Sequence, residues 1–581
     1  MPRMIQELKP FWKKIVMIAL LVFFQSYAQL YLPRLMSDIV DIGIIQGDIP
    51  YIIRLGLIML LVAAAGTLCS IIVSQLSAVV STGFARDIRQ LVFAHVQSFS
   101  LENFEEIGTA SLITRTTNDV TQLQQVLIML LRMMLSAPIM CVGGIVMAVS
   151  QNAELSMLLI IVIPLLTLAI IVISRKTLPL FKQLQNKLDK LNLVMRERLT
   201  GIRVIRAFNR TDYESRRFVS ANSDLTENAI KVNIIMAVLM PLMMLIMNLA
   251  TIAVVWFGAI QISAGKMQVG SLMAFIQYIM LILFSLLMFS MMFVMLPRAA
   301  ASAARISEVL DKGDVPVAPV APVAHSSEIS LGINKGHISF QDVTFSYPSA
   351  EKPVLKNISF DAYPGQTTAI IGSTGSGKST LITLLMRFYD VNFGKIKIDG
   401  IDIRELPEEE LRKHIGFIPQ KALLFSGSIA ENIRFGKQDS TMDEIMTAAR
   451  IAQAEDFILK QADGYATSLA QGGVNLSGGQ KQRISIARAL IRKAKIYLFD
   501  DSFSALDYKT DSMLRSALKE NVTDATILIV AQRVSTVLNA DQIIVLDDGE
   551  IVGIGKHLDL LEGCKVYAEI VSSQLTREVP A

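Results

Sequence analysis

The sequence predicts a membrane domain of six α-helical spans with long cytoplasmic extensions, followed by an α/β domain built around a phosphate-binding loop. Three observations predict this: long apolar stretches confined to the first 310 residues, a change in charge content at that point, and a glycine-rich loop in the second part. Of the 581 residues, 52% are hydrophobic and 18% are charged, against about 45–50% and about 25% in soluble domains. This composition excludes a disordered chain and an ordinary cytosolic enzyme.

Six stretches are long and apolar enough to cross about 30 Å of hydrocarbon as helices. Their starting points lie near Ile15, Tyr51, Val126, Leu155, Val232 and Ser271. The first stretch follows two lysines, as the core of a signal peptide does. Its apolar run reaches Leu35 without a clear small-residue cleavage site, so we expect it to be retained as a span.

Basic residues in the loops predict the orientation of the spans. Residues 175–231 contain 13 Lys or Arg, whereas the three loops at 36–50, 151–154 and 261–270 contain one, Lys266. The positive-inside bias therefore places both termini in the cytoplasm, and we expect the chain in the inner (plasma) membrane of the cell. Residues 81–125 and 175–231 are too long for turns and are apolar at helical spacing, so they are expected to extend the spans as helical hairpins.

Polar side chains within apolar spans face a cavity or a partner helix. Seven such residues are present: Gln25, Gln29, Ser74, Gln75, Arg132, Asn248 and Gln277. Of the 28 methionines, 24 precede residue 300, with clusters at Met240, Met243, Met244 and Met247 and at Met288, Met291, Met292 and Met295. Flexible thioethers suit a surface that repacks around different apolar ligands. The clusters therefore allow two interpretations, an apolar cargo surface and filling of the membrane core.

The charge balance and a proline-rich stretch divide the chain. The first 310 residues hold 26 Lys+Arg and 17 Asp+Glu, whereas the remainder hold 29 and 34. A stretch with Pro316, Pro319 and Pro322 and no hydrophobic period is typical of a linker. We expect a transmembrane domain at 1–310, a linker at 311–336, a soluble domain at 337–575 and a tail at 576–581.

A phosphate-binding motif lies between an apolar strand, residues 367–371, and an apolar helix that continues from Leu381. The motif GxxxxGKS comprises Gly372, Ser373, Thr374, Gly375, Ser376, Gly377, Lys378 and Ser379, and Thr380 follows it. The glycines let backbone N–H groups surround the phosphates of ATP at a helix N-terminus. Lys378 adds a positive charge, and the Ser379 hydroxyl is a predicted Mg²⁺ ligand.

Two further motifs complete the predicted nucleotide chemistry. Asp500 ends the buried strand 496–500 and is the predicted carboxylate partner of Mg²⁺. Twenty residues before it lies the motif LSGGQ, made of Leu476, Ser477, Gly478, Gly479 and Gln480. Alone, LSGGQ would be a weak loop signal, but its place between the phosphate loop and Asp500 makes it specific.

With these motifs in order, the chain resembles an ATP-binding-cassette (ABC) exporter half-transporter over nearly its whole length. The resemblance implies that two chains enclose two ATP molecules, each bound by one chain's phosphate loop and the other chain's LSGGQ. It also implies that Tyr347 stacks on adenine, that Gln420 senses the metal, and that residues 504–507 contact the second chain. Coupling helices are expected near residues 101–108 and 208–214.

Two positions depart from the family pattern in the hydrolytic machinery. Asp501 stands where the family has the glutamate that polarises the attacking water, and Gln532 stands where it has a switch histidine. A shorter acid misplaces its carboxylate, and glutamine cannot carry a proton. Residues 471–473, Gln-Gly-Gly, also replace the family's Glu-x-Gly before LSGGQ. These changes predict a degenerate ATP site at Asp501 and Gln532.

The intact LSGGQ predicts a heterodimer in which a second half-transporter supplies the missing glutamate and histidine, an arrangement similar to bacterial heterodimeric multidrug exporters. The predicted activity is ATP-driven export of amphipathic or hydrophobic compounds across the bilayer, with ATP and Mg²⁺ as ligands. The alternatives are a regulatory ATP-binding subunit of a lipid or peptide exporter and a slowly hydrolysing homodimer. The acidic soluble part has no basic patch interleaved with aromatics, which excludes a nucleic-acid partner.

Overall fold

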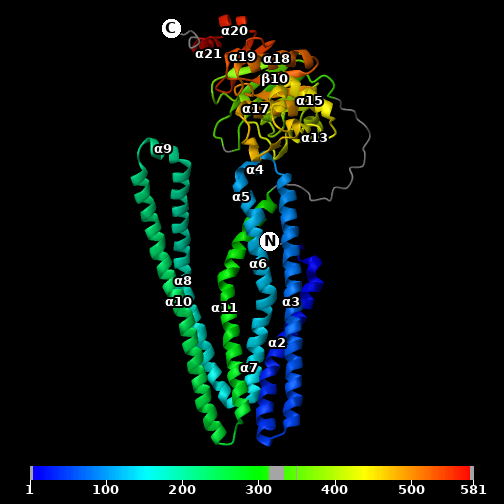
Figure 1. Cartoon of the computed structure of the whole chain (residues 1–581). Helices are drawn as coiled ribbons and strands as arrows, with labels where there is room; N and C mark the ends of the chain where they lie inside the picture. The colour runs from blue at the N-terminus through cyan, green and yellow to red at the C-terminus, as the bar shows by residue number, and fades with distance from the viewer. Residues whose placement is uncertain (1–3, 5, 313–332, 349, 576–581) are drawn as a thin grey trace. The chain divides into compact units, whose positions relative to one another are not determined.

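The computed structural model describes residues 4, 6–312, 333–348 and 350–575, with backbone alone at 290–294 and 575 (Figure 1). Residues 313–332 of the predicted linker and the predicted tail at 576–581 lie outside the described residues. The chain divides into two compact units, the first helical and the second mixed α/β.

The first unit contains the predicted spans. By length and composition, six helices of the described residues can cross a membrane, which confirms the predicted number. The helical segments are η1 (Lys9–Phe11), α2 (Trp12–Asp38), η2 (Ile39–Ile44), α3 (Ile49–Gln97), α4 (Leu101–Ile107), α5 (Thr109–Thr114), η3 (Arg115–Asp119), α6 (Val120–Met129), η4 (Leu130–Met134), α7 (Leu135–Gln151), α8 (Ala153–Thr200), α9 (Ile202–Ala207), α10 (Thr211–Ser263) and α11 (Val269–Asp311).

Four described helices are much longer than a bilayer requires, among them α11 with 43 residues. α3 has 49 residues, α8 has 48 and α10 has 53, whereas about 20 suffice to span the hydrocarbon. α8 and α10 run side by side and are joined at their far end by the short helix α9 (Figure 1). The predicted helical extensions are therefore present, with α3 continuing to Gln97, α8 to Thr200 and α10 beginning at Thr211.

The second predicted coupling helix is displaced along the chain. α4 lies at the first expected position, but the second short helix is α9, which ends directly before the expected range 208–214. α8 ends where the N–H of Gly201 donates to the carbonyl of Glu197, and Asn209, with φ of 52°, turns the chain into α10. Asparagine tolerates this left-handed conformation, so residues 208–210 form the turn and the short helix precedes it.

A buried carboxylate joins the ends of the first and last spans. Asp41, in η2, is 7% exposed and accepts hydrogen bonds from the N–H groups of Gly270 at 2.5 Å and Ser271 at 2.9 Å. The hydroxyl of Ser37 also donates to it, at 3.1 Å. These N–H groups belong to the first turn of α11 and have no partner within the helix. Asp41 therefore caps α11 from another span.

Replacing Asp41 by alanine is expected to lower the stability of the protein by about 1–3 kcal/mol, because two buried N–H groups lose their acceptor. Thermal unfolding in detergent or nanodiscs, followed by intrinsic fluorescence, measures the loss as a lower Tm. The Asp41→Asn variant keeps one acceptor oxygen and is expected to lose less. An alanine variant as stable as the parent would contradict this role.

The described residues of the second unit form three sheets. The largest has six strands in the order β12-β11-β3-β10-β9-β6, in which only the pairing of β12 with β11 is antiparallel. A second sheet has the order β2-β1-β4-β5, and β7 pairs with β8. The strands are β1 (Ile338–Phe345), β2 (Leu355–Ala362), β3 (Thr367–Gly372), β4 (Phe393–Ile398), β5 (Ile401–Asp402), β6 (Ile415–Ile418), β7 (Gly427–Ser428), β8 (Ser468–Leu469), β9 (Ile496–Asp500), β10 (Thr526–Val530), β11 (Gln542–Asp547) and β12 (Glu550–Gly555).

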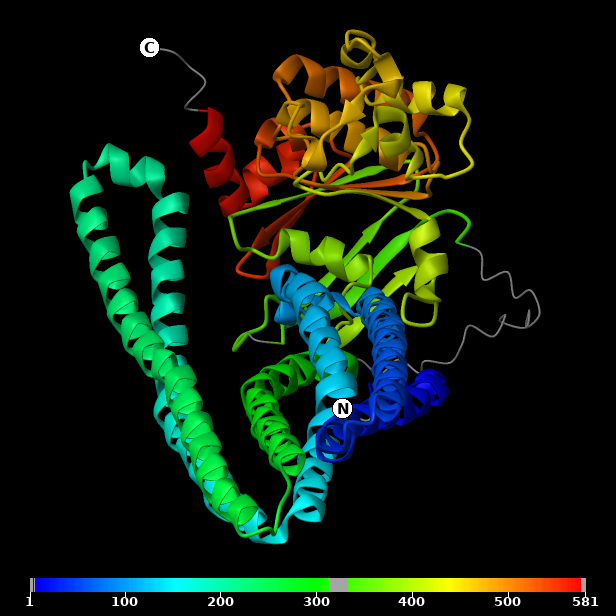
Figure 2. The same ribbon diagram turned by 60° about the horizontal axis from the view of Figure 1, so that its bottom comes forward.

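Helices cover the six-stranded sheet on both faces (Figure 2). The helical segments of this unit are α12 (Lys378–Leu385), α13 (Glu408–Lys413), α14 (Ile429–Arg434), α15 (Met442–Ile451), α16 (Glu455–Leu459), η5 (Gly464–Ala466), η6 (Gln471–Gly473), α17 (Gly478–Leu490), α18 (Tyr508–Asn521), α19 (Val534–Val537), α20 (His557–Gly563) and α21 (Lys565–Leu575). Successive strand residues point to opposite faces. Ile370 packs with α12 and the four-stranded sheet, whereas Ile371 belongs to the core with α15, α17 and α18.

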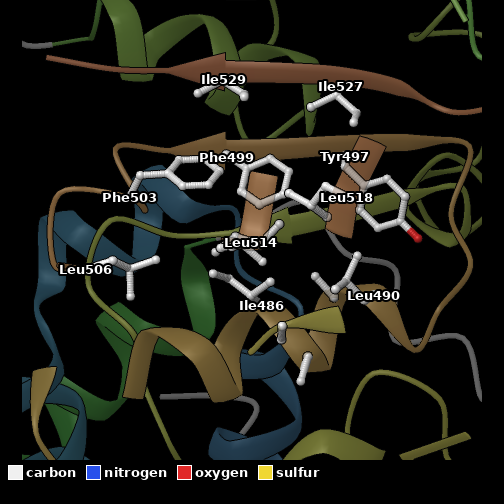
Figure 3. Packing of buried hydrophobic residues seen from close by; sticks show 14 of the residues in the cluster. Ile486, Leu490, Tyr497, Phe499, Phe503, Leu506, Leu514, Leu518, Ile527 and Ile529 are labelled. Carbon is white, nitrogen blue, oxygen red and sulfur yellow. The ribbon is translucent and has the colours of Figure 1, made fainter. Parts of the chain in front are cut away.

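The core that contains Ile371 fixes the position of α17, the helix that begins within LSGGQ. Phe499 of β9 and Ile529 of β10 lie close to Ile486 of α17 and Leu514 of α18 (Figure 3). Each of these four side chains is at most 4% exposed. α17 is thus held against the strands whose ends carry Asp500 and the segment leading to Gln532.

Candidate nucleotide-binding site

The predicted site residues follow neighbouring parallel strands at one edge of the six-stranded sheet. The phosphate loop follows β3, Gln420 follows β6, Asp500 and Asp501 lie at the end of β9, and Gln532 follows β10. Val530 of β10 is level with Ile370 on one side and with Asp500 on the other. Because parallel strands end at the same edge, the sheet brings these groups together.

The glycines of the phosphate loop occupy positions where a side chain would be strained or would clash. Gly375 and Gly377 have φ of 87° and 95°, which L side chains rarely adopt. A Cβ on Gly372 would come 2.1 Å from the carbonyl oxygen of Leu546. The loop is therefore compact and opens α12, whose first N–H groups are suited to binding phosphate.

Lys378 lies inside this loop. Its Nζ donates to the carbonyl oxygens of Gly372 at 2.9 Å and Ser373 at 2.6 Å. The side chain of Ser376, which is 1% exposed, lies 3.4 Å from the same nitrogen. Burial lowers the pKa of Lys378, and the nearby carboxylates of Asp501 and Asp500 act in the opposite direction. Among the described residues no carboxylate hydrogen-bonds to Lys378, so this buried cation is available to a phosphate.

Ser379 and Asp500 provide a donor set for Mg²⁺. The Ser379 hydroxyl donates to Asp500 Oδ1 at 2.8 Å, so a hydroxyl and a carboxylate oxygen converge at the end of the phosphate loop. Burial raises the pKa of Asp500, and the Ser379 hydrogen bond opposes that rise. Mg²⁺ prefers oxygen ligands of this kind, together with phosphate oxygens and water. The residues therefore fit the ion, which would neutralise phosphate charge when bound.

Asp501 is fixed on the metal side of the site. It has φ of 45°, its N–H donates to the carbonyl of Val530 at 2.9 Å, and it is 9% exposed. Gln420 Nε2 donates to Asp501 Oδ2 at 3.3 Å. Gln532 has an exposed side chain, and its carbonyl accepts from Gln574 of α21 at 2.9 Å. The structure therefore joins Asp501 to Gln420 directly and anchors Gln532 through its backbone.

Tyr347 lies beside α12. Its hydroxyl is 3.2 Å from Thr380 Oγ1, and its ring meets the edges of Phe345 and Tyr389 at centroid distances of 5.0 and 5.3 Å. Tyr389 follows the first helical turns after the phosphate loop, and the sequence analysis did not single it out. Its proximity in sequence to that loop was the available signal.

The LSGGQ residues form a second group. Ser477 begins α17 with a reciprocal pair of hydrogen bonds to Gln480, at 3.3 and 2.9 Å. A Cβ on Gly479 would lie 3.1 Å from the carbonyl oxygen of Ala505, within the predicted dimer-contact segment. Among the described residues, no hydrogen bond joins this group to the phosphate loop of the same chain.

Gln482 is a connection that the sequence analysis missed. It is 1% exposed, and its Nε2 donates to the carbonyl of Pro419 at 3.1 Å. Pro419 precedes Gln420, so α17 is tied to the segment that contacts Asp501. A glutamine inside an otherwise ordinary helix carries no sequence signal for this contact.

The fold and the site define a membrane protein with a phosphate-loop nucleotide-binding domain on the same chain. Residues 15–287 match the family described as the ABC transporter transmembrane region, and residues 355–504 match the family described as the ABC transporter. An uncharacterized ABC transporter ATP-binding protein of Mycobacterium tuberculosis is 44% identical over 98% of this chain and 97% of its own length.

Two further relatives are informative. An ATP-dependent lipid A-core flippase of Thiobacillus denitrificans is 30% identical over 99% of this chain and 98% of its own length. The structure of a bacterial Atm1-family ABC exporter with ATP bound has a TM-score of 0.79 at 27% identity, covering 98% of this chain and 99% of that chain. The chain belongs to the ABC transporter family and has the arrangement of an exporter half-transporter. It is a multi-pass membrane protein with an ATPase domain.

Proposed function

We propose that this chain is one half of a heterodimeric ABC exporter of the inner (plasma) membrane, with both termini cytoplasmic. Its own phosphate loop, Mg²⁺ ligands and Tyr347 bind ATP at a degenerate site. Its LSGGQ completes, in trans, the hydrolytic site of a partner that carries the missing glutamate and histidine.

The observation that carries this proposal is the contrast within the site. Lys378, Ser379 and Asp500 have the contacts expected of nucleotide and metal binding, whereas Asp501 and Gln532 replace the hydrolytic groups. An aspartate is shorter than a glutamate by one methylene, about 1.5 Å. Because Gln420 and Val530 tether Asp501, this residue is not free to recover that length. Misplacement by about 1 Å is enough to slow a reaction about 100-fold.

A groove in the membrane unit is an argument for an amphipathic or hydrophobic cargo. It measures about 520 Å³ and is lined by Gln29, Leu32, Pro33, Met247, Ile276, Gln277, Met280, Leu281 and Phe284. The groove joins α2, α10 and α11, and it combines two of the predicted span glutamines with apolar side chains. Ligand sites of this size are mostly apolar with few polar groups. We propose that it contributes to a site for multidrug efflux.

The methionine clusters contribute only in part. Met247 lines the groove, but Met243 is 2% exposed and belongs to the packed core of the helices. The side chains of Met291 and Met292 lie outside the described residues. Of the two interpretations, filling of the membrane core therefore fits Met243.

The test compares the chain alone with the chain bound to its partner. We expect slow ATP hydrolysis by the chain alone and fast hydrolysis by the pair, which is lost when the partner's glutamate is removed. Fast hydrolysis alone would favour a homodimer.

A Met247→Trp plug is expected to reduce transport at least about 10-fold, whereas Leu249→Trp on the opposite side of α10 should not. Unimpaired transport by the plugged pair would favour a regulatory subunit of a lipid or peptide exporter.

A further inference from the structure

Ion pairs and hydrogen bonds fasten the last helix of the membrane unit to its first hairpin, which is formed by the end of α3, α4, α5, η3 and the start of α6. Asp119, the last residue of η3, is 3% exposed. Arg305 of α11 donates to it through Nε at 2.8 Å and Nη2 at 2.5 Å, and the Ser302 hydroxyl donates at 2.9 Å. Arg115 donates to the carbonyl of Arg305 and to Glu308, both at 3.0 Å.

The same junction continues to the end of α11. His95 of α3 hydrogen-bonds through Nε2 to the carbonyl of Lys312 at 2.7 Å, and Lys312 forms an ion pair with Glu106 of α4. Between the polar contacts lies an apolar cluster that includes Ile306 of α11 and Ile88 of α3. The attachment therefore extends along α11 from residue 302 to residue 312.

Asp119 fixes the alignment of α11 against the first hairpin at this junction. Arg115 to Asp119 form a π-helical turn, a rare distortion that is frequent at functional positions. A carboxylate this buried is costly unless it is paired. Replacing such a pair by apolar residues often costs no stability, and a bidentate arginine contact adds geometric specificity. The pair of Asp119 and Arg305 is therefore better suited to fixing the position of α11 against the hairpin than to stabilising the fold.

The junction also has a defined place in the chain. α11 is the last helix of the membrane unit, and from Lys312 the chain continues to the nucleotide-binding unit. The first hairpin continues without interruption into α3, which is a span, and through α6 toward α7, which belongs to the next. A displacement that reaches the end of α11 can pass through the junction into two other spans.

We propose that Asp119 and Arg305 are a positioning pair that makes the end of α11 and the first hairpin move as one rigid body during the transport cycle. Nucleotide-driven motion then reaches the spans only while this pair is intact. The proposal concerns coupling within one chain and holds for either a homodimer or a heterodimer.

The first test measures the junction without requiring hydrolysis. In full-length protein with Cys69, Cys141 and Cys564 replaced by serine, spin labels are placed by Ile113→Cys in α5 and Ala304→Cys in α11, both at exposed positions. Dipolar broadening reports their separation without nucleotide and with ATP. We expect one narrow separation, unchanged by ATP. A separation that changes with ATP would overturn the proposal.

The second test removes the pair. Asp119→Ala leaves Arg305, whose side chain is 47% exposed, free to be hydrated, so the variant should fold. We expect a broadened separation, unchanged ATP binding, and transport per ATP hydrolysed reduced at least about 10-fold. The separate variant Arg305→Lys, which keeps the charge beside Asp119, should retain part of the coupling. Arg86→Ala, which breaks an exposed ion pair on α3, is the control. Unchanged coupling in Asp119→Ala, with the parent's narrow separation, would reject the pair's role.

Discussion

The double variant Asp501→Glu/Gln532→His is expected to hydrolyse ATP at least about 10-fold faster than the parent when this chain is purified alone. Where two copies of this chain pair in such a preparation, each phosphate loop meets the LSGGQ of the other copy, and that motif is intact. The substitutions return the carboxylate that polarises water and the side chain that can carry a proton. Phosphate release at saturating Mg²⁺-ATP measures the gain.

Two comparisons separate restored chemistry from altered binding in this experiment. Adding Lys378→Ala to the double variant should remove most of the gain, because the phosphate loop then binds ATP much more weakly and lacks the charge that stabilises the transferred phosphate. Each single variant should gain less than the double variant, because both groups act in the same step. An unchanged rate in the double variant would show that Asp501 and Gln532 do not limit hydrolysis.

Lys378→Ala is expected to weaken ATP binding at this chain's site about 100-fold. A hydrogen bond to a charged group contributes about 1.5–3 kcal/mol, and 1.4 kcal/mol corresponds to a tenfold change. The amine also holds the carbonyls of Gly372 and Ser373, so its removal loosens the loop. Equilibrium binding of a fluorescent ATP analogue measures the change.

The matched control for that substitution is Lys356→Ala. Lys356 is a partly exposed lysine of the same domain that pairs with Glu550 at 3.4 Å. Its removal should leave ATP affinity unchanged, since exposed ion pairs contribute little. Equal losses in both variants would indicate a general destabilisation, and no loss in Lys378→Ala would contradict the assignment of the phosphate loop.

The spans and the binding motifs could be predicted because their signals are local. An apolar stretch of span length, or a glycine-rich loop between a strand and a helix, is visible in one segment. The meeting of Gln420, Asp501 and the phosphate loop also follows from parallel strands that end at one edge. The side-chain hydrogen bond from Gln420 to Asp501 is a detail of packing that no spacing predicts.

Contacts between segments far apart in the sequence were not predictable in the same way. Asp41 with α11, Asp119 with Arg305, and Gln482 with Pro419 pair residues far apart in sequence, and neither partner has a pattern of its own. The sequence left the role of Met243 open for a related reason. A helix that is apolar on all sides gives no periodicity from which its packed face can be told.

We propose that this chain binds ATP but cannot hydrolyse it efficiently. Isolation of the chain from native membranes tests this proposal most directly. An affinity tag on this chain is used to recover the intact transporter, and the subunits are identified by mass before ATPase activity is measured. We predict a second half-transporter with a glutamate after its metal aspartate, and slow turnover by this chain without it. Recovery of this chain paired only with itself, together with rapid ATP hydrolysis, would contradict the account.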